Sequence, residues 1–337
     1  MAWPDDGVGP TRDFVGYGPT TPEFLWPDGS AVAVSIVVNY EEGAELSLVD
    51  GDGVNDTWGE YSSVVEPTYR DLGTETHFEF GSRVGVWRLA RLFDEYSVPV
   101  SFGACAVALE RNPPLCDWLR DRDHEVVGHG YRWTDDWKLP RDEERRLMRL
   151  AIESVEETTG QRVRGWYVRS FPSVNTRELL VEEGGFLYDS DACNDEIPYF
   201  ADVGGTPFLV VPYTKVFNDN RYFIAPTYAT PDHFFENLRL GLETFRREAA
   251  NGHGSRLFTV GVHSRWSGQP NRADALRRFV EQVQGCDDVC FMRRVDVARF
   301  WIERFGLRTR SRARSRLPEA PPGADGGGGG RGGTSAR

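Results

Sequence analysis

The segment from residue 31 to residue 43 constrains this chain more than any other part of its sequence. Residues 31–38 are mostly small or β-branched, which is typical of a strand that is buried on both faces. Two adjacent carboxylates, Glu41 and Glu42, follow this strand, and Gly43 then lets the backbone turn sharply. Successive residues of an extended chain point to opposite faces, so Glu41 and Glu42 cannot both face the core. Carboxylates at this end of the first strand of an α/β protein lie where such folds place their active sites.

Strand-like and helix-like patterns alternate along the rest of the chain, which favours a parallel α/β sheet or barrel. No glycine-rich phosphate loop follows the first strand, so a barrel fits better than an open, doubly wound sheet. The long polar stretch between residues 43 and 76 is expected to be a loop. The expected strands cover residues 31–38, 98–104, 125–129, 163–168, 186–188, 208–211, 257–262 and 289–292. The expected helices cover residues 82–96, 109–120, 142–158, 176–183, 231–249, 272–283 and 295–305.

The sequence divides into three parts that differ in composition. Residues 1–30 predict an irregular N-terminal arm that packs on the barrel, and residues 31–307 predict a single catalytic barrel domain. Residues 308–337 are rich in Arg and Gly and cannot bury a core, so we expect a disordered tail there. An electrostatic tether for acidic partners is the other interpretation of this tail, although a solvated tail is the more common outcome.

Charge and composition argue against several classes of function. A net charge of −13 disfavours nucleic-acid binding by the barrel. No run of apolar residues is long enough to cross a membrane, and residues 1–30 lack the apolar run of a signal peptide. The five cysteines are scattered and form no CxxC pair, which indicates reduced thiols. We therefore expect a cytoplasmic protein whose partner is a small-molecule substrate.

Several predicted strands end in residues that can carry chemistry. These ends hold Glu41 and Glu42, His129 with Arg132 and Trp133, Tyr167 with Arg169, Asp189 with Asp191, and His263 with Arg265. In an α/β barrel the carboxyl ends of the strands share one rim, so we expect these side chains to meet there. Each of these residues, taken alone, could have a purely structural role. A single buried histidine, for example, is as often only hydrogen-bonded as catalytic. Five such strand ends on one rim favour a functional site.

Carboxylates, two histidines and arginines suit hydrolysis. A carboxylate can take a proton from water, a histidine can protonate the departing atom, and arginines or backbone N–H groups can stabilise the oxyanion. No Gly-x-Ser-x-Gly elbow is present, and no cysteine has a nearby histidine of the usual signatures. A covalent nucleophile is therefore not expected.

Seven motifs resemble those of the polysaccharide deacetylase superfamily. They are Asn39–Gly43, Phe80–Arg88, Gly128–Trp133, Gly165–Tyr167, Asn175–Arg177, Glu183–Asp191 and Gly261–Arg265. Within the superfamily they are most similar to the bacterial allantoinase branch, and the resemblance runs from about Gly16 to Trp301. It implies a distorted (β/α) barrel of the NodB type and hydrolysis of a carbon–nitrogen bond without a covalent intermediate. It also implies a homo-oligomer, which members of the family tend to form.

The metal-dependent members of the family carry an Asp pair in the first motif and a second histidine four residues after the first. Here Glu41 and Glu42 replace the Asp pair, and Trp133 occupies the place of the second histidine. An indole cannot bind a metal, so Glu42 and His129 remain, one ligand short of the usual catalytic site. The allantoinase branch is regarded as working without a metal, and the resemblance to it implies that no cofactor is required.

The resemblance implies that the chain opens the hydantoin ring of allantoin, or of a related cyclic ureide or imide, to a ureido acid. Glu41 matches the family's first acidic position and is the expected water-activating base. His263 matches the last motif and is the expected general acid, while Glu42 and His129 are expected to orient water or substrate. The expected substrate-binding residues are Tyr40, Arg132, Trp133, Tyr167, Arg169, Asp189 and Arg265.

Other functions remain open from the sequence. One is removal of the acetyl group from an N-acetyl sugar or peptidoglycan, which would normally need the metal that Trp133 disfavours. Another is binding without catalysis on a degenerate barrel. The joint presence of Glu41, Glu42, His129 and His263 argues against it. Residues 168–176 also depart from the allantoinase pattern at the rim, so the same scaffold could act on a different substrate.

Overall fold

The fold is built around one curved sheet, most of whose strands are parallel. The computed structural model describes residues 9–314 except residues 61–62, 67, 170 and 226. The strands are β1 (Val32–Tyr40), β2 (Ser101–Ala104), β3 (Glu125–Gly128), β4 (Gly165–Trp166), β5 (Tyr188–Asp189), β6 (Tyr199–Val203), β7 (Thr206–Val210), β8 (Arg256–His263) and β9 (Val289–Phe291). Every residue of β1 is buried, as the sequence predicts for this strand.

Strand β1 pairs with three other strands, and its carboxyl end lies at the same edge of the sheet as the ends of its neighbours β2 and β8. The strand order is β6-β7-β5-β4-β3-β2-β1-β8, and β9 pairs with the first half of β1. Near the carboxyl end of β1, Asn39 pairs with Gly103 on β2 and with His263 on β8. Because neighbouring parallel strands end at the same edge of a sheet, the residues that follow β1, β3 and β8 come together there.

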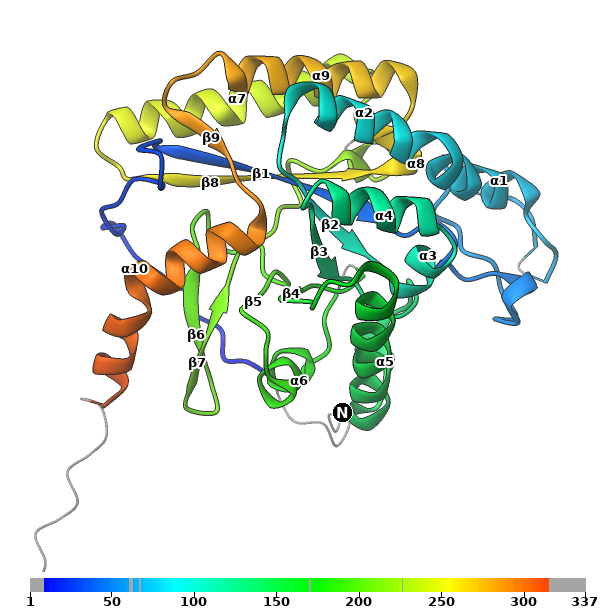
Figure 1. The fold of residues 1–337 in the computed structure, drawn as a ribbon, viewed down its shortest axis with the longest axis horizontal. Helices are drawn as coiled ribbons and strands as arrows, with labels where there is room; N and C mark the ends of the chain where they lie inside the picture. Colours follow the sequence, from blue (N-terminus) through cyan, green and yellow to red (C-terminus); the bar gives the residue numbers. More distant parts are fainter. Residues whose placement is uncertain (1–8, 61–62, 67, 170, 226, 315–337) are drawn as a thin grey trace, which may run out of the picture.

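Helices cover the outside of the curved sheet. They are α1 (Leu72–Phe80), α2 (Val86–Tyr96), α3 (Ala106–Glu110), α4 (Pro113–Asp121), α5 (Arg141–Thr159), α6 (Thr176–Glu183), α7 (Pro231–Ala250), α8 (Ser264–Ser267), α9 (Pro270–Gln284) and α10 (Arg294–Arg314). Short helical turns are η1 (Leu48–Asp50), η2 (Gly81–Gly85), η3 (Asp136–Lys138) and η4 (Asp219–Tyr222). In Figure 1, α2, α7 and α9 lie together above β1 and β8, and α5 lies at the far side of the molecule, beyond β3 and β4.

The helix after the first loop begins earlier than the sequence pattern predicts. The pattern predicts a loop to residue 76 and a helix over 82–96, whereas α1, the π-helical turn η2 and α2 run without a break from Leu72 to Tyr96. Asp71 caps the start, because its Oδ1 accepts a hydrogen bond from the backbone N–H of Thr74 at 3.0 Å. The residues of α1 are mostly polar and lack an apolar stripe, so periodicity does not reveal this helix.

Strands β6 and β7 form an antiparallel hairpin that the sequence analysis does not anticipate. The predicted strand at 208–211 is only the second half of this hairpin. The turn is made by Gly204 and Gly205, whose φ angles are 57° and 84°. Two consecutive glycines adopt this left-handed conformation without steric cost, and the turn is typical of tight hairpins. The sheet is therefore mixed rather than wholly parallel.

The two ends of the described chain pack against each other. The ring of Phe24 lies 5.0 Å from that of Trp301 on α10, and Trp26 lies 5.4 Å from Phe300. Helix α10 continues to Arg314, so it includes residues 308–314, the first part of the predicted tail. The rest of the predicted tail, residues 315–337, lies outside the described residues.

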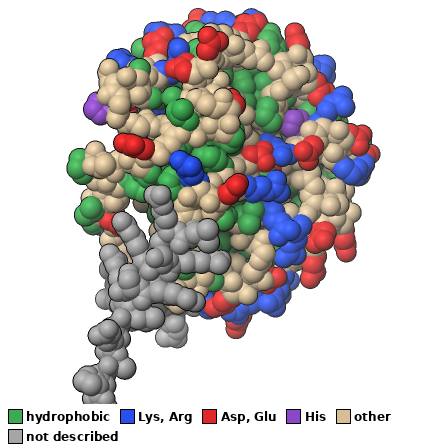
Figure 2. Space-filling model, turned by 60° about the vertical axis from the view of Figure 1, so that its left-hand side comes forward, with side chains coloured by type: hydrophobic (Ala, Val, Ile, Leu, Met, Phe, Trp, Pro, Cys, Tyr) green, Lys and Arg blue, Asp and Glu red, His purple; other side chains and the backbone are tan. Residues whose placement is uncertain are grey.

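The surface mixes charges of both signs. Figure 2 shows acidic and basic side chains interspersed over the face that it presents. Many of them form pairs along one helix, as Arg239 does with Glu236 and Glu243. Exposed pairs of this kind contribute little to stability, typically below about 1 kcal/mol each. Among the helices that the structure describes, none is long and apolar enough to cross a membrane.

A glycine in β2 allows a tyrosine to reach the middle of the sheet. A Cβ atom at Gly103 would overlap the hydroxyl and ring of the buried Tyr167. This hydroxyl donates a hydrogen bond to Oδ1 of Asn39 at 2.6 Å. We predict that Gly103→Ala lowers the free energy of unfolding by about 1–3 kcal/mol, which is the usual cost of overpacking a core.

Gly306→Ala on α10 is the matched control. A Cβ there would lie 3.6 Å from Ile302, which is an ordinary contact. Alanine favours a helix over glycine by up to about 1 kcal/mol, so this variant should be at least as stable as the parent chain. Urea unfolding of both variants checks the prediction, and equal stability of Gly103→Ala and the parent would contradict it.

Candidate active site

A cavity opens at the carboxyl ends of the parallel strands. Its volume is about 580 Å³, including its open mouth. Six residues that the sequence singles out line it, namely Glu41, His129, Trp133, Tyr167, Arg169 and His263. Asp191, which also follows a predicted strand, lines it as well, as do Asn39, Trp58, Tyr213, Lys215 and Trp266. The structure therefore brings the ends of β1, β3, β4 and β8 together, as the barrel prediction requires.

Glu41 is the centre of this site. Its Oε1 lies 3.3 Å from Nε2 of His129 and 3.5 Å from Nε2 of His263. Its Oε2 lies 2.8 Å from Nη1 of Arg265. Burial by itself would raise the pKa of Glu41, but Arg265 and His263 hold it well below its usual range. Glu41 is therefore ionised at neutral pH.

His263 is held by Asp219 on η4. The imidazole Nδ1 donates to Oδ1 of Asp219 at 2.6 Å, and the backbone N–H of His263 donates to Oδ2 at 2.8 Å. The hydroxyl of Ser267 donates to the same Oδ2 at 2.6 Å. Burial would lower the pKa of His263, but Glu41 and Asp219 raise it to about 9. At neutral pH the ring is therefore an imidazolium whose Nε2–H is available beside Glu41.

His129 is oriented by the backbone of the next strand. Its Nδ1 donates to the carbonyl oxygen of Tyr167 at 2.9 Å, and this leaves Nε2 facing Oε1 of Glu41. These two atoms are 3.3 Å apart, which is a direct contact with no room for a water molecule between them. The hydroxyl of Tyr167 donates in turn to Oδ1 of Asn39 at 2.6 Å. Asn39 is itself held by Tyr213, because its Nδ2 donates to the Tyr213 hydroxyl at 3.0 Å.

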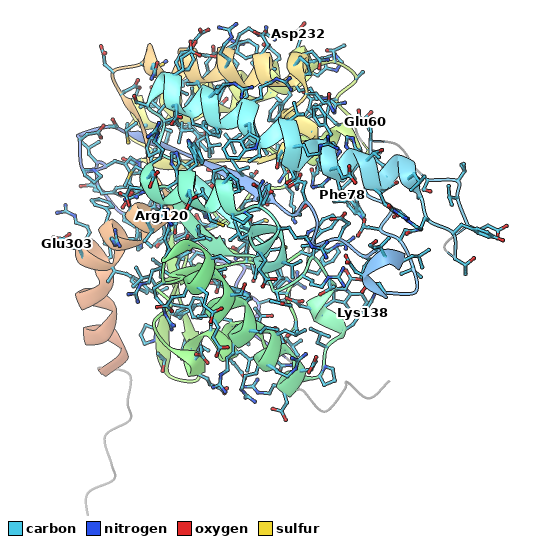
Figure 3. The ribbon with its side chains drawn as sticks, turned by 45° about the vertical axis from the view of Figure 1, so that its right-hand side comes forward. Glu60, Phe78, Arg120, Lys138, Asp232 and Glu303 are labelled. Atoms are coloured by element: carbon cyan, nitrogen blue, oxygen red, sulfur yellow. The ribbon has the colours of Figure 1, made fainter. Side chains whose placement is uncertain are left out.

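Arg265 supplies a fully buried positive charge next to Glu41. Its guanidinium carbon lies 4.6 Å from the ring centre of Phe78, 5.1 Å from Trp133 and 4.4 Å from Trp266. Figure 3 shows Phe78 below α1, on the side of the helix that faces the rest of the chain. Aromatic faces attract a cation, so these rings hold the guanidinium where few other polar groups reach it. Arg265 acts on Glu41 and is not among the residues that line the cavity.

Glu42 lies on the opposite side of the strand end and is not part of the cavity lining. Its carboxylate accepts hydrogen bonds from the backbone N–H of Glu41 at 3.0 Å, from Oγ of Ser264 at 3.0 Å and from the N–H of Arg265 at 3.1 Å. Burial and the nearby Glu41 raise the pKa of Glu42, although Arg265 opposes the change. These contacts tie α8 to the end of β1. The predicted role of Glu42 in orienting water or substrate has no contact to support it.

Besides Arg265, three of the predicted substrate-binding residues lie away from the cavity. Tyr40 is fully buried in the core. Arg132 pairs with Asp52 at 2.6 Å, and Asp189 pairs with Arg177 at 2.5 Å. Adjacent positions at a strand end point to different faces, so a strand end alone does not decide which residue meets the substrate.

Trp133 and Arg169 form one wall of the cavity. The guanidinium carbon of Arg169 lies 3.7 Å above the Trp133 ring. Its Nη1 also donates to Oδ2 of Asp56 at 2.7 Å and to the carbonyl oxygen of Trp133 at 2.8 Å. These contacts join the loop after β1 to the loops after β3 and β4.

The sequence patterns do not reveal Asp219, and they place Asp191 at a strand end without assigning it to the substrate. Asp219 lies in a stretch without strand or helix periodicity, where the run Asn218-Asp219-Asn220 is the one visible signal. A parallel bridge between Asn218 and Gly261 of β8 brings this run beside His263. Asp191 follows Asp189 by two positions, and the structure places Asp191 rather than Asp189 in the cavity wall.

Comparison with known proteins identifies the family. The family model for polysaccharide deacetylases matches residues 75–177. The structure resembles that of a probable polysaccharide deacetylase from Pseudomonas aeruginosa PAO1, with 39% identity, a TM-score of 0.82 and coverage of 87% of this chain and 98% of that one. It also resembles the structure of the PuuE allantoinase, with 38% identity, a TM-score of 0.82 and coverage of 88% and 98%. A Schizosaccharomyces pombe protein, provisionally named a polysaccharide deacetylase, is 31% identical over 311 residues, covering 86% of this chain and 97% of that protein.

The fold and the site define a hydrolase scaffold in which strand ends surround a carboxylate and two histidines. The chain belongs to the polysaccharide deacetylase family. The predicted fold, a distorted (β/α) barrel of the NodB type, is confirmed by these two structural matches. The prediction that the chain resembles this family is confirmed as well.

The residues present do not fit the metal site of metal-dependent family members. Within the described ranges, no group of three or more His, Cys, Asp or Glu side chains is arranged to hold a metal ion. Glu42, one of the two remaining candidate ligands, is bonded to Ser264 and Arg265 instead. The guanidinium of Arg265 also places a fixed positive charge beside Glu41, and this charge opposes the binding of a second cation.

We predict that Asp219→Asn lowers the pKa of His263 by about 1–3 units, because an opposite charge in direct contact usually has an effect of this size. NMR titration of the imidazole signals measures the change. The chain has six histidines, so His263→Gln assigns the signal. Ser267→Ala removes a hydrogen bond from Asp219 without removing the charge and should shift the titration much less. An unchanged His263 titration in Asp219→Asn would contradict the prediction.

Proposed function

We propose that this chain hydrolyses a carbon–nitrogen bond of a cyclic ureide, and that allantoin is the first substrate to test. The observation that carries the proposal is the pairing of an ionised Glu41 with a protonated His263, whose facing atoms are 3.5 Å apart. Two neighbouring groups whose pKa values are pushed apart can serve as base and acid at the same pH. This arrangement suits hydrolysis of an amide-type bond, in which one proton is removed and another is supplied.

The reaction would proceed by direct attack of water. Glu41 takes a proton from the water molecule while the water oxygen forms a bond to the ring carbonyl carbon. His263 gives its Nε2 proton to the ring nitrogen as the carbon–nitrogen bond breaks. The product carries a new carboxyl group and an open ureido group. The proton on Glu41 then passes to His263, which restores both side chains to their starting state. His129, whose Nε2 also faces Glu41, is placed to hold the water.

The cavity suits a small, flat and polar substrate. Aromatic side chains from five segments wall it, namely Trp58, Trp133, Tyr167, Tyr213 and Trp266. Flat rings pack well between aromatic walls, while a few placed polar groups fix their orientation. The similarity to the PuuE allantoinase over nearly the whole barrel supports a ureide as the substrate.

Deacetylation of an amino sugar is the alternative function. A Helicobacter pylori peptidoglycan deacetylase is 28% identical to this chain over 158 residues, 46% of this chain and 52% of that protein. The resemblance implies that deacetylation would need a metal, and the donor set described above does not fit one. Parallel assays with allantoin and with oligomers of N-acetylglucosamine separate the two functions.

We predict that Glu41→Gln lowers kcat for allantoin by about 10²–10⁴-fold, which is the usual contribution of a general base. Glutamine keeps the shape of the side chain but cannot accept the proton. Allantoate release, measured at saturating substrate, gives kcat directly.

Glu125→Gln is the matched control for this variant. Glu125 is equally buried and accepts hydrogen bonds from Ser101 and Tyr188, but it lies at the opposite end of β3 from His129. It should retain most of the turnover. Similar losses in both variants would indicate general damage to the fold and would count against Glu41 as the base.

We predict that turnover of allantoin survives exhaustive chelation, because Arg265 supplies a positive charge next to Glu41 and the described residues do not fit a metal site. Allantoate release is measured before and after treatment with a strong chelator, with metal analysis of both samples. Loss of activity on chelation, with recovery on adding zinc, would overturn this prediction.

A further inference from the structure

One oxygen in the cavity wall lacks a partner. Asp191 follows β5, and its Oδ1 accepts a hydrogen bond from the backbone N–H of Val168 at 2.9 Å. Its Oδ2 is buried and has no hydrogen-bond partner among the residues that the structure describes. Buried polar atoms in folded proteins almost always have a partner, so an exception in a cavity wall indicates a group that awaits a ligand.

The position of Asp191 separates it from the catalytic groups. In the sheet, β2, β3 and β4 lie between β5 and β1, so Asp191 and Glu41 approach the cavity from different sides. A ligand that touches both must therefore span the cavity. The part of a substrate near Asp191 is consequently distinct from the part near Glu41 and His263.

We propose that Asp191 is a substrate-positioning residue whose protonated Oδ2 donates a hydrogen bond to a carbonyl oxygen of the cyclic ureide. The proposal rests on the proposed function and extends it, because it assigns the group that holds the substrate away from the bond that breaks. A neutral carboxylic acid can donate in this way, whereas an ionised carboxylate can only accept.

The charges around Asp191 favour its neutral form. Asp189 at the end of β5 and Asp136 on η3 are carboxyl groups that face it, and both disfavour a further negative charge. The nearby cation, Arg177 on α6, is committed to Asp189 at 2.5 Å. Burial and then Asp189 raise the pKa of Asp191 to about 8. Because Oδ1 accepts from Val168, the proton belongs on the free Oδ2.

Two further cations line the same cavity and do not neutralise Asp191. Arg169 is paired with Asp56 at 2.7 Å. Lys215 lies at an exposed position of the lining, and within the described part of the chain no ion pair joins it to Asp191. The side of the cavity around Asp191 therefore offers a neutral donor rather than an ion, which matches an uncharged carbonyl better than a charged substrate group.

The test compares the full-length parent chain with Asp191→Asn and Asp191→Ala. Asparagine imitates the protonated acid, since its amide oxygen can accept from Val168 and its NH₂ group can donate to the substrate. At pH 7 we expect Asp191→Ala to raise KM for allantoin about tenfold with a smaller effect on kcat, which corresponds to one lost hydrogen bond. Asp191→Asn should recover most of this loss.

The pH dependence adds a second readout. In the parent chain, KM should rise as the pH passes about 8, because Asp191 then loses the proton that it donates. In Asp191→Asn this rise should be absent. If Asp191→Asn binds as poorly as Asp191→Ala, or if the KM of the parent falls above pH 8, Asp191 acts as an ionised acceptor and the proposal is wrong. Equal KM values in all three proteins would also overturn it.

Binding of hydantoin, measured by calorimetry, keeps the test independent of turnover. If the parent chain hydrolyses no ureide, the proposed function fails, but the Asp191 proposal still predicts weaker hydantoin binding in Asp191→Ala and recovery in Asp191→Asn. Failure of the parent chain to bind hydantoin, or equal binding by all three proteins, overturns the Asp191 proposal as well.

Thermal unfolding verifies that Asp191 is buried in its neutral form. When folding raises the pKa of an aspartate, the protein becomes less stable as the pH rises from the pKa of the unfolded state to that of the folded state. For Asp191 these values are near 3.8 and about 8. The Tm of Asp191→Asn should therefore exceed that of the parent by an amount that grows between about pH 4 and pH 8. A constant difference over this range would show that Asp191 is ionised, and the donor role would be lost with it.

Discussion

The buried contact between Arg265 and Glu41 is the interaction on which the site depends. Two adjacent carboxylates are buried at the end of β1, and removing such charges from water is costly unless they are paired. Arg265 lies 2.8 Å from Glu41 and 3.6 Å from Glu42, so one guanidinium serves both. Without it, the negative charge of either carboxylate would be harder to bury in this position. The aromatic rings around Arg265 and the carboxylate of Glu42, which binds the start of α8, keep the guanidinium in place.

The architecture around this contact explains several unusual features of the chain. Helix α8 carries Arg265 directly after β8, and β8 is the neighbour of β1 in the sheet. A Cβ atom at Gly85 would overlap the backbone oxygen of Ser264, so the glycine lets the π-helical turn η2 approach α8 closely. The same helical segment brings Phe78 onto the guanidinium. The early start of α1 and the π-helical turn are thus part of how the buried cation is enclosed.

The sequence identified the central residues of the site, Glu41, His129 and His263, better than the residues that surround them. Glu41, His129 and His263 follow buried strands, and parallel strands bring their carboxyl ends together whatever the loops do. Arg132 and Asp189 also follow strands, yet each turns to a partner outside the cavity, and that choice depends on loop geometry that no local pattern encodes. Asp219 was missed because its segment has no periodicity and is placed by a single bridge to β8. The Gly204-Gly205 turn was a visible hairpin signal, but the strand before it alternates only weakly.

The lowered pKa of Glu41 has two opposite consequences for the proposed mechanism. A strongly lowered pKa keeps Glu41 ionised but makes it a weak base, and proton transfer is best when the base has a pKa near the working pH. In the proposed reaction His263 relieves this conflict, because the proton that stabilises Glu41 in the resting state is the one that the leaving nitrogen would receive. When His263 gives up that proton, one of the two cations beside Glu41 disappears. The pKa of Glu41 then rises, and the carboxylate holds the proton taken from water more firmly at the stage when its return would reverse the reaction. The coupling of the two groups through one 3.5 Å contact therefore favours the forward direction more than either pKa alone would suggest.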